Sequence, residues 1–225
     1  MNFKKIFIIL LGTVLFVSSL SAQYVGKEFI FSGLVEYDES GNKIHEKGEE
    51  SEVWLEYDEN GNLTHSKVAD IYDDWATREY WFTYDSEGKR IGERGADGEY
   101  SFEYDEQNHK IIEHGGNRGN WVYDCDEKWN KLHGSNGVIQ WWAKYDSNGN
   151  QILHRDMEGF VITYEYDSKN HLTKKSEYNK YITNYEYDPN GNLFRESSNY
   201  TSDVWYAYTY WSNGKVKSQR RFRQK

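Results

Sequence analysis

Histidine is the residue type in this sequence with the most readily recognised chemistry. His45 and His65 each stand eight residues after a tyrosine, so equivalent positions of a repeating fold would bring them near one another. A structural zinc site needs about four Cys, His or carboxylate ligands at short characteristic spacings. No such spacing occurs among the histidines, so we expect them to be solvated and the protein to hold no metal. The seven are His45, His65, His109, His114, His133, His154 and His171.

Aspartates recur in segments such as Asp58-Glu59-Asn60-Gly61-Asn62, whose composition would also suit a calcium loop. Calcium takes about six to eight oxygen ligands, usually with a bidentate glutamate further along the chain. Each segment here offers one aspartate in a position typical of a turn cap. We therefore predict turn chemistry for these aspartates.

Catalytic motifs are the next possibility. The chain has no Ser/His/Asp order, no Gly-x-Ser-x-Gly elbow, no phosphate-binding loop and no paired acids in a familiar context. We expect a protein that is not an enzyme and that needs no cofactor.

Aromatic side chains give the strongest indication of binding. Trp141 and Trp142 are consecutive in an expected strand, so their rings should point to opposite faces of the sheet. Trp205 and Trp211 belong to a second aromatic cluster near the end of the chain. Exposed aromatic rings suit sugar rings or protein partners, although rings packed in a core are the alternative. We predict Trp141, Trp142, Trp205 and Trp211 as binding residues.

These residues sit within a repeat of about 20 residues. Nine tyrosines are followed four residues later by Gly or a substitute for it, and eight of them are followed at once by Asp. A period of this length is typical of a repeat protein whose units share a core with their neighbours. The copies are Tyr37-Asp38, Tyr57-Asp58, Tyr84-Asp85, Tyr104-Asp105, Tyr123-Asp124, Tyr145-Asp146, Tyr166-Asp167, Tyr187-Asp188 and the degenerate Tyr210-Trp211.

The position four residues after each tyrosine predicts a hairpin turn. Six copies have Gly there, and Asn108 and Asn170 occupy it in two others. Gly and Asn accept a left-handed backbone at low cost, and Asp is favoured at the first position of a type I turn. Asp-x-x-Gly therefore marks a hairpin tip.

Alternating residues before each tip, such as Tyr80, Phe82 and Tyr84, have the period of two that indicates a strand. One hairpin per repeat gives about 16 to 18 strands, and open sheets seldom exceed ~10 without curling. We predict an all-β domain of tandem hairpins, residues 23–225 with repeats over 34–220. A rolled antiparallel meander with the tyrosines inside is favoured, with an open twisted sheet as the alternative.

The repeats resemble the YD-repeat family of Rhs and teneurin-type proteins, whose units read roughly Tyr-x-Tyr-Asp-x-x-Gly-x-Leu. The stretch from Tyr185 to Leu193 fits this pattern throughout, and Leu55 to Leu63 fits with Leu for the first Tyr. The resemblance implies β-hairpins coiled into a spiral sheet and a carbohydrate-binding role. The family's long array and toxin segment have no counterpart here; MORN-like hairpin repeats are a related comparison.

Residues 1–22 have the features of a secretory signal peptide. Lys4 and Lys5 precede an apolar stretch from Ile6 to Val17, and small residues lead to Ala22. Removing the two lysines lowers the formal charge from −10 to −12. We expect export to the periplasm, the outer surface or the medium, with no membrane span after signal removal. A chain this acidic is a poor candidate for binding nucleic acid.

Three features depart from the repeat. The step from Tyr57 to Tyr84 is longer than the others, and its insertion over residues 68–77 predicts a loop or short helix. The fifth copy places Glu127 where Gly is expected, and it contains Cys125, the only cysteine. A basic C-terminal stretch is interpreted as a solvated last strand that could also pair with acidic rims or touch anionic polymers. It comprises Lys215, Lys217, Arg220, Arg221, Arg223 and Lys225.

The sequence favours a non-catalytic exported binding module whose partner is a glycan or a protein of the cell envelope. One alternative is a hydrolase with a site in the concave face, built from acids of the irregular loops. Another is an outer-membrane barrel, but membrane strands need ~9–11 residues with a lipid-facing apolar row, and the mean hydropathy here is −0.97. The hydrolase acids would be Asp73, Asp74, Asp126 and Glu127. Oligomeric state is left open.

Overall fold

The computed structural model describes residues 29–72, 77–96, 98–115 and 119–224. In these ranges all regular structure is β, in 18 strands joined by short turns. The strands are β1 (Phe29–Tyr37), β2 (Lys43–Lys47), β3 (Ser51–Tyr57), β4 (Leu63–Asp70), β5 (Arg78–Tyr84), β6 (Arg90–Gly95), β7 (Gly98–Asp105), β8 (Lys110–Gly115), β9 (Trp121–Cys125), β10 (Lys131–Ser135), β11 (Gln140–Tyr145), β12 (Gln151–Asp156), β13 (Val161–Tyr166), β14 (Leu172–Glu177), β15 (Tyr181–Tyr187), β16 (Leu193–Ser198), β17 (Val204–Tyr210) and β18 (Val216–Gln224).

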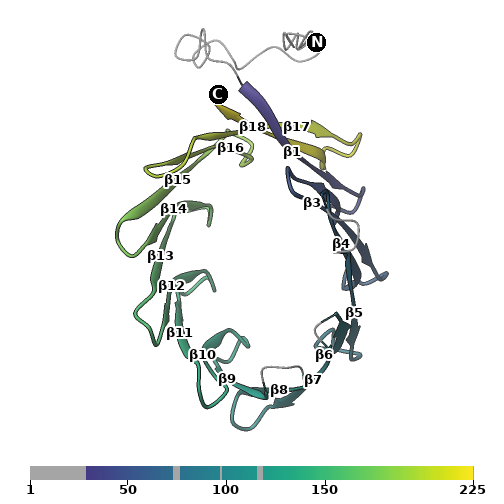
Figure 1. The fold of residues 1–225 in the computed structure, drawn as a ribbon, viewed down its shortest axis with the longest axis vertical. Coiled ribbons are helices and arrows are strands. Elements are labelled where there is room, and N and C mark those ends of the chain that lie inside the picture. Colours follow the sequence, from purple (N-terminus) through teal and green to yellow (C-terminus); the bar gives the residue numbers. More distant parts are fainter. Residues whose placement is uncertain (1–28, 73–76, 97, 116–118, 225) are drawn as a thin grey trace.

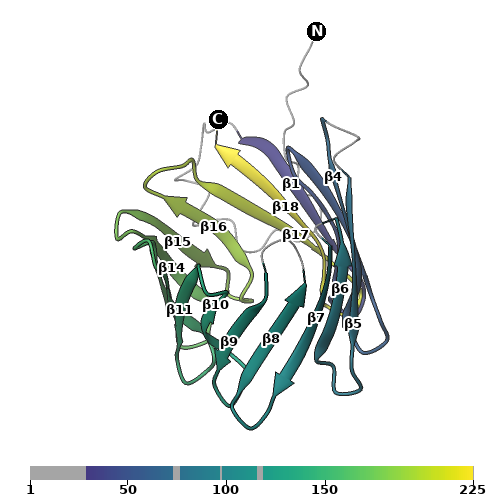
Figure 2. The same ribbon diagram turned by 60° about the horizontal axis from the view of Figure 1, so that its bottom comes forward.

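The strands form a closed barrel. Each pairs antiparallel with its neighbours in sequence, and β18 pairs with β1 from Phe29↔Gln224 to Glu36↔Ser218. Figure 1 shows the resulting oval ring, and Figure 2 shows neighbouring strands side by side around its wall. The predicted rolled meander is confirmed, and the open twisted sheet was the wrong alternative.

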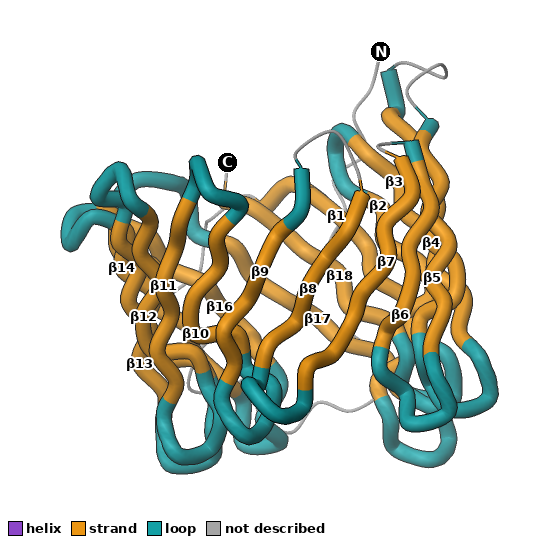
Figure 3. Tube along the Cα trace, turned by 90° about the horizontal axis from the view of Figure 1, so that it is seen from below, coloured by secondary structure: helices purple, strands orange, loops and turns teal. Residues whose placement is uncertain are grey.

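The turns lie at two opposite ends of the barrel (Figure 3). Hairpins that join an odd-numbered strand to the next even one carry the Asp-containing turns, and we call their end the Asp rim. Hairpins that join an even-numbered strand to the next odd one form the opposite rim. The chain enters β1 and leaves β18 at this opposite rim, because β1 ends and β18 begins at turns of the Asp rim.

The turn after β3 shows how an Asp turn is held. The N–H of Gly61 donates to the carbonyl of Asp58 at 3.1 Å, and Gly61 has φ 83°. One carboxylate oxygen of Asp58 accepts the Asn62 N–H at 2.8 Å, and the other accepts the Asn62 side-chain amide at 2.9 Å. A β-bulge adjoins the turn: Tyr57 pairs with Leu63 but Glu56 pairs with His65, so the register between β3 and β4 shifts by one residue. These carboxylate oxygens are engaged by the turn, which confirms turn capping.

Acidification should destabilise the barrel through these turns. Hydrogen bonds from Asn62 and Asn150, side chain first, lower the pKa of Asp58 and Asp146. A carboxyl with a lowered folded-state pKa adds stability above its unfolded pKa of about 3.9, and that stability is lost as pH falls through the folded value. These aspartates should leave the melting temperature unchanged from pH 7 to about 5 and lower it below about pH 4.

Calorimetry of the wild type and of a D58N/D146N variant measures this effect. The variant should melt lower at pH 7 and lose less on acidification, because two titrating groups are gone. If the melting temperatures of the two proteins fell equally on acidification, the role of these aspartates in the pH dependence would be contradicted.

Tyrosine hydroxyls connect successive strands into a ladder. The hydroxyl of Tyr57 on β3 donates to the carbonyl of Lys43 on β2 at 2.9 Å. The same bond recurs around the wall and ties each repeat to the one before it. The other donor and acceptor pairs are Tyr84 to Leu63, Tyr104 to Arg90, Tyr145 to Lys131, Tyr166 to Gln151, Tyr187 to Leu172 and Tyr208 to Leu193.

The tyrosine face is the inner face of the wall. Side chains of this face from β16, β17 and β18 line two hollows, with Tyr208 and Gln219 in one and Glu196 and Arg221 in the other. A hollow shared by several neighbouring strands forms on the concave side of a curved sheet. Phe102, Ile111, Tyr123 and Cys125 on the same face form the buried core, joined by Tyr100, Tyr104, Trp121, Trp129 and Trp141. Aromatic rings thus dominate the core.

The fifth turn corrects the predicted repeat. The turn begins at Asp126, whose carbonyl accepts the N–H of Trp129 at 3.0 Å, and Trp129 takes the left-handed conformation with φ 63°. Cys125 therefore stands in the tyrosine position, and the Tyr123-Asp124 assignment with Glu127 in the Gly position was wrong. In the fourth turn, the residue with positive φ is His109 rather than Asn108, whereas Asn170 has φ 65° as predicted.

The predicted signal peptide and residues 73–76 of the long insertion, including Asp73, Asp74 and Trp75, lie outside the described residues. Before it, β4 continues the sheet as far as Asp70. No helix that is long and apolar enough to cross a bilayer occurs in the described ranges.

Candidate functional site

Trp141 and Trp142 lie on opposite faces of β11, as the period of two requires. Trp141 is on the inner face, packed over Gly134 and 6.1 Å from the Tyr123 ring. Trp142 is on the outer face, where it stacks on His133 at 5.4 Å between ring centroids. Both rings are half-buried by protein neighbours.

The two C-terminal tryptophans have structural contacts of their own. Trp205 lies on the outer face of β17, edge-on to Phe29 at 5.0 Å. Trp211 occupies the position of Asp in the last turn, and its indole N–H donates to the carbonyl of Tyr37 at 3.1 Å. That bond joins the last hairpin to the first strand. The structure thus spreads the four predicted residues over different faces and does not gather them into one site.

Histidines on the outer face sit between carboxylates and tryptophans. His45 lies 2.8 Å from both Glu36 and Glu52 and stacks on Trp54. Burial alone would lower the pKa of His45, but the hydrogen bonds to the two glutamates outweigh burial, so the pKa is raised overall. His65 repeats the arrangement with Trp81 one repeat on. Among the residues that the structure describes, no group of three or more His, Cys, Asp or Glu is placed to hold a metal ion.

The basic last strand closes the barrel, and most of its described basic side chains are exposed, as expected for a solvated strand: Lys215, Lys217, Arg220 and Arg223. Arg221 crosses over Gly33 on β1 to reach Glu46 on β2 at 3.4 Å, and Arg223 pairs with Glu49 at 2.8 Å. The predicted pairing with acidic rim residues is thus present for these two arginines.

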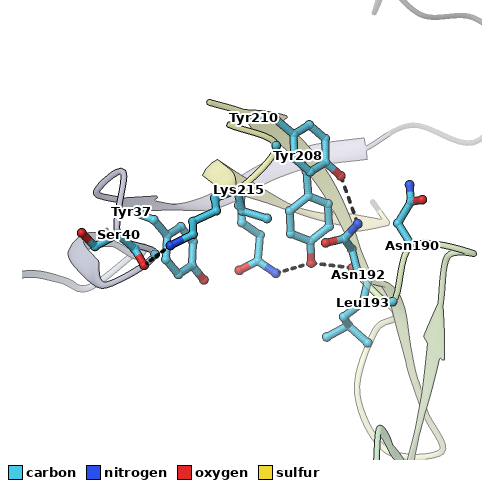
Figure 4. A pocket seen from close by; sticks show the side chains of 13 residues that line it. Tyr37, Ser40, Asn190, Asn192, Leu193, Tyr208, Tyr210 and Lys215 are labelled. Carbon is cyan, nitrogen blue, oxygen red and sulfur yellow. Dashed lines mark hydrogen bonds between the residues drawn. The ribbon is translucent and has the colours of Figure 1, made fainter. Parts of the chain in front are cut away.

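A hollow of about 920 Å³ lies on the inner face at the Asp rim, where the barrel closes (Figure 4). We call it the seam hollow. Its wall is formed by β17, β18 and the adjoining turns after β1 and β15. It is lined by Tyr37, Ser40, Gly41, Asn190, Gly191, Asn192, Leu193, Tyr208, Tyr210, Gly214, Lys215, Val216 and Gln219.

The tyrosine ladder changes register at the seam hollow. In the last repeat Tyr208, and not Tyr210, donates to the Leu193 carbonyl, at 2.7 Å. Tyr210 instead accepts a hydrogen bond from the Asn192 amide at 3.0 Å and is 46% exposed. Within the described ranges the Tyr37 hydroxyl has no hydrogen-bond partner. Two phenolic groups are therefore left outside the ladder in the same hollow.

The electrostatics of the seam hollow favour neutral hydrogen bonding. Burial raises the pKa of Tyr208 to about 12 and also raises the pKa of Tyr37 and Tyr210, so the hydroxyls stay protonated at neutral pH. Gln219 donates to the Tyr208 hydroxyl at 2.7 Å, and Lys215 is held by the Ser40 carbonyl at 2.8 Å. The lining contains no carboxylate in a chain of net charge −10. Rings, amides and hydroxyls thus meet in one place.

Sequence reasoning identified the C-terminal aromatic cluster but chose its tryptophans rather than its tyrosines. The available signal was the 23-residue step from Tyr187 to Tyr210, which displaces the last tyrosine from the ladder. The contribution of Tyr37 depends on barrel closure and has no local signal.

The fold and the hollow together define a closed barrel of hairpin repeats with an aromatic and amide-lined recess at its seam. No family model matches the chain, and no curated protein matches it. Solved structures with a similar β architecture exist at low identity.

One is the TcdB2-TccC3 complex without its hypervariable C-terminal region, with 14% identity over 91% of this chain and TM-score 0.37. Another is the Photorhabdus luminescens Tc holotoxin pore, with 14% identity over 91% of this chain and TM-score 0.33. This chain spans only 14% of each of those two chains. A third is a porin-like protein from Bacteroides uniformis, with 13% identity, 87% of this chain and 97% of that chain covered, and TM-score 0.44. These likenesses concern the fold alone.

Proposed function

We propose that the protein is an exported, non-catalytic module that binds a neutral oligosaccharide of the cell envelope in the seam hollow. The observation that carries the proposal is the break in the tyrosine ladder, which leaves Tyr37 and Tyr210 available in a recess that also holds Asn192 and Gln219. Sugars present apolar ring faces and many hydroxyls, and aromatic faces next to amide groups match both. A volume of about 920 Å³ accommodates a short oligosaccharide.

Binding without hydrolysis follows from the composition of the hollow. Glycoside hydrolysis commonly uses two carboxyl groups about 5 to 10 Å apart, and the lining offers none. Of the acids considered for a hydrolase, Asp126 is engaged as the cap of the fifth turn, accepting the N–H groups of Lys128 and Asn130. The net charge of −10 also disfavours nucleic acid as a ligand.

The outer wall is less suited to lipid than to water, which disfavours the outer-membrane alternative. Charges occur along its whole height: Glu56 near the Asp rim, Lys174 in mid-strand and Arg155 towards the other rim. Only β1 and β18 reach nine residues, against the ~9–11 that a membrane strand needs. We propose that the wall itself does not span a bilayer.

Screening of the mature chain against immobilised neutral oligosaccharides, followed by calorimetric titration, tests the function. Y210A should weaken binding about tenfold, because a stacked aromatic ring contributes about 0.5–1.5 kcal/mol. Y37F should weaken it about fivefold through loss of one hydroxyl, worth about 1 kcal/mol. Y178N, on the opposite rim, is the matched control and should bind like the wild type.

Absence of binding to any neutral oligosaccharide at millimolar concentration would overturn the proposal, as would binding that Y210A leaves unchanged. Capture of an envelope protein whose binding Y210A abolishes would also overturn it, in favour of a protein ligand at the same hollow.

A further inference from the structure

The two rims of the barrel differ in polarity. In the described residues, the turns of the rim opposite the Asp turns carry large apolar side chains that are 41% to 80% exposed. None of the exposed large apolar side chains in the described part lies within the turns of the Asp rim. We call the apolar set the apolar rim: Ile71, Tyr72, Val138, Ile139, Met157, Tyr178 and Tyr200.

Local structure holds these side chains outward. The Asn136 side chain accepts the N–H groups of Val138 and Ile139, and this turn leaves Val138 76% exposed. Tyr178 packs edge-on against Phe160 of the previous turn at 4.8 Å. The Tyr181 ring contacts Tyr200 of the next turn at 5.1 Å. Ring contacts thus connect three successive turns of the apolar rim, those with Met157, Tyr178 and Tyr200, so docking would require little further ordering of these turns.

We propose that the apolar rim docks end-on to the surface of a zwitterionic lipid bilayer. This interaction lies beyond the oligosaccharide binding proposed above. The apolar side chains stand at the tips of separate turns around a ring, whereas a protein partner needs a contiguous complementary patch. Tyrosine and aliphatic tips of this kind suit the interfacial zone of a membrane, where an apolar body and a polar end are both accommodated.

Charge and chain direction indicate which bilayer and which end. The described turns of this rim hold Glu49, Glu50, Glu158 and Asp203 against Lys180, with Glu49 paired to Arg223 and Asp203 to Arg195. The rim thus offers no positive patch, and the net charge of −10 of the whole chain would repel anionic lipid. β1 also begins at this rim, and the sequence of the 28 residues before it is apolar from Ile6 to Val17. In the precursor, the rim would therefore be the end of the barrel nearest to the membrane.

Flotation of the mature chain with phosphatidylcholine vesicles tests the docking. A rim variant, Y72S/V138S/M157S/Y178N/Y200S, should lose at least tenfold in vesicle partition. The matched wall variant I44T/I91T/V122T/L132T/I152T removes exposed apolar groups from the outer wall and should stay within twofold of the wild type. Replacing one-fifth of the lipid by phosphatidylserine should weaken wild-type partition several-fold. Tyr178 takes Asn because its φ is 52°.

A single-site measurement keeps the test valid if the rim variant fails to fold. An environment-sensitive fluorophore on M157C should brighten at least twofold on vesicles, whereas the same label on S147C at the Asp rim should not change. The docking is overturned if wild type does not float, if both labels brighten alike, if phosphatidylserine strengthens binding, or if sedimentation shows a dimer that the rim variant dissolves. Oligosaccharide titration of the rim variant should match the wild type, which separates this proposal from the one above.

Discussion

Replacing Phe102 by alanine should lower the free energy of unfolding by about 3 kcal/mol, the lower end of the usual range for a buried phenylalanine. Phe102 is 7% exposed and belongs to the cluster with Ile111, Tyr123 and Cys125. The guanidinium of Arg90 lies 4.5 Å above its ring. The inner face can take up some water when the ring is removed, so the cost should stay below the upper limit for a sealed core.

Urea denaturation monitored by far-ultraviolet circular dichroism measures this cost. Trp81→Ala is the control, because it removes a larger aromatic ring from the outer face, where Trp81 is 40% exposed. The control should cost about 1 kcal/mol, chiefly from lost stacking on His65 and Arg94. A larger loss for Trp81 than for Phe102 would mean that the core lies on the outer face, contrary to the burial pattern.

The local elements of the fold follow from short stretches of sequence. Asp58 and Gly61 determine a turn through a carboxylate that accepts backbone N–H groups and a residue that tolerates positive φ. Alternation before the turn then fixes which side chains face the core. Such features depend on neighbours within a few residues, which is why the hairpins and their approximate number were predictable.

The fifth repeat was misassigned because one motif was weighted above another. Tyr123-Asp124 matches the dyad, but the turn is determined by Asp126 together with Asn130, whose side chain donates to the carboxylate of Asp126 at 2.9 Å. The same Asp-x-x-x-Asn spacing occurs from Asp38 to Asn42 and from Asp58 to Asn62. Counting this second spacing would have placed the turn correctly.

Closure and the seam hollow were beyond local reasoning. The Trp211 indole and the Tyr37 carbonyl are separated by 174 residues and meet only once the wall has completed its circuit. Whether a tyrosine hydroxyl is free depends on the carbonyl that its strand register presents to it, as the exchange of Tyr208 for Tyr210 shows. Sequence could therefore indicate an aromatic binding surface but not which rings remain available.

Closure should matter more to stability than chain length. Deleting residues 146–166 removes β12 and β13 and joins Tyr145 directly to Asp167, which recreates a Tyr-Asp turn between β11 and β14. Each repeat contacts only its neighbours, so we expect a soluble, cooperatively unfolding barrel of two fewer strands. Deleting residues 215–225 removes roughly half as many residues but includes the whole of β18.

The shorter deletion should be the more damaging, because β18 pairs with both β17 and β1. Its loss exposes two long strand edges, which are templates for aggregation, and it removes the Arg221–Glu46 and Arg223–Glu49 ion pairs. We expect the truncated chain to aggregate, while the repeat deletion keeps the oligomeric state of the full chain and has a lower melting temperature. Size-exclusion chromatography with light scattering and calorimetry distinguishes the two. A soluble, cooperatively folded truncation would show that the seam contributes little, and aggregation of the repeat deletion alone would show that the repeats are not interchangeable units.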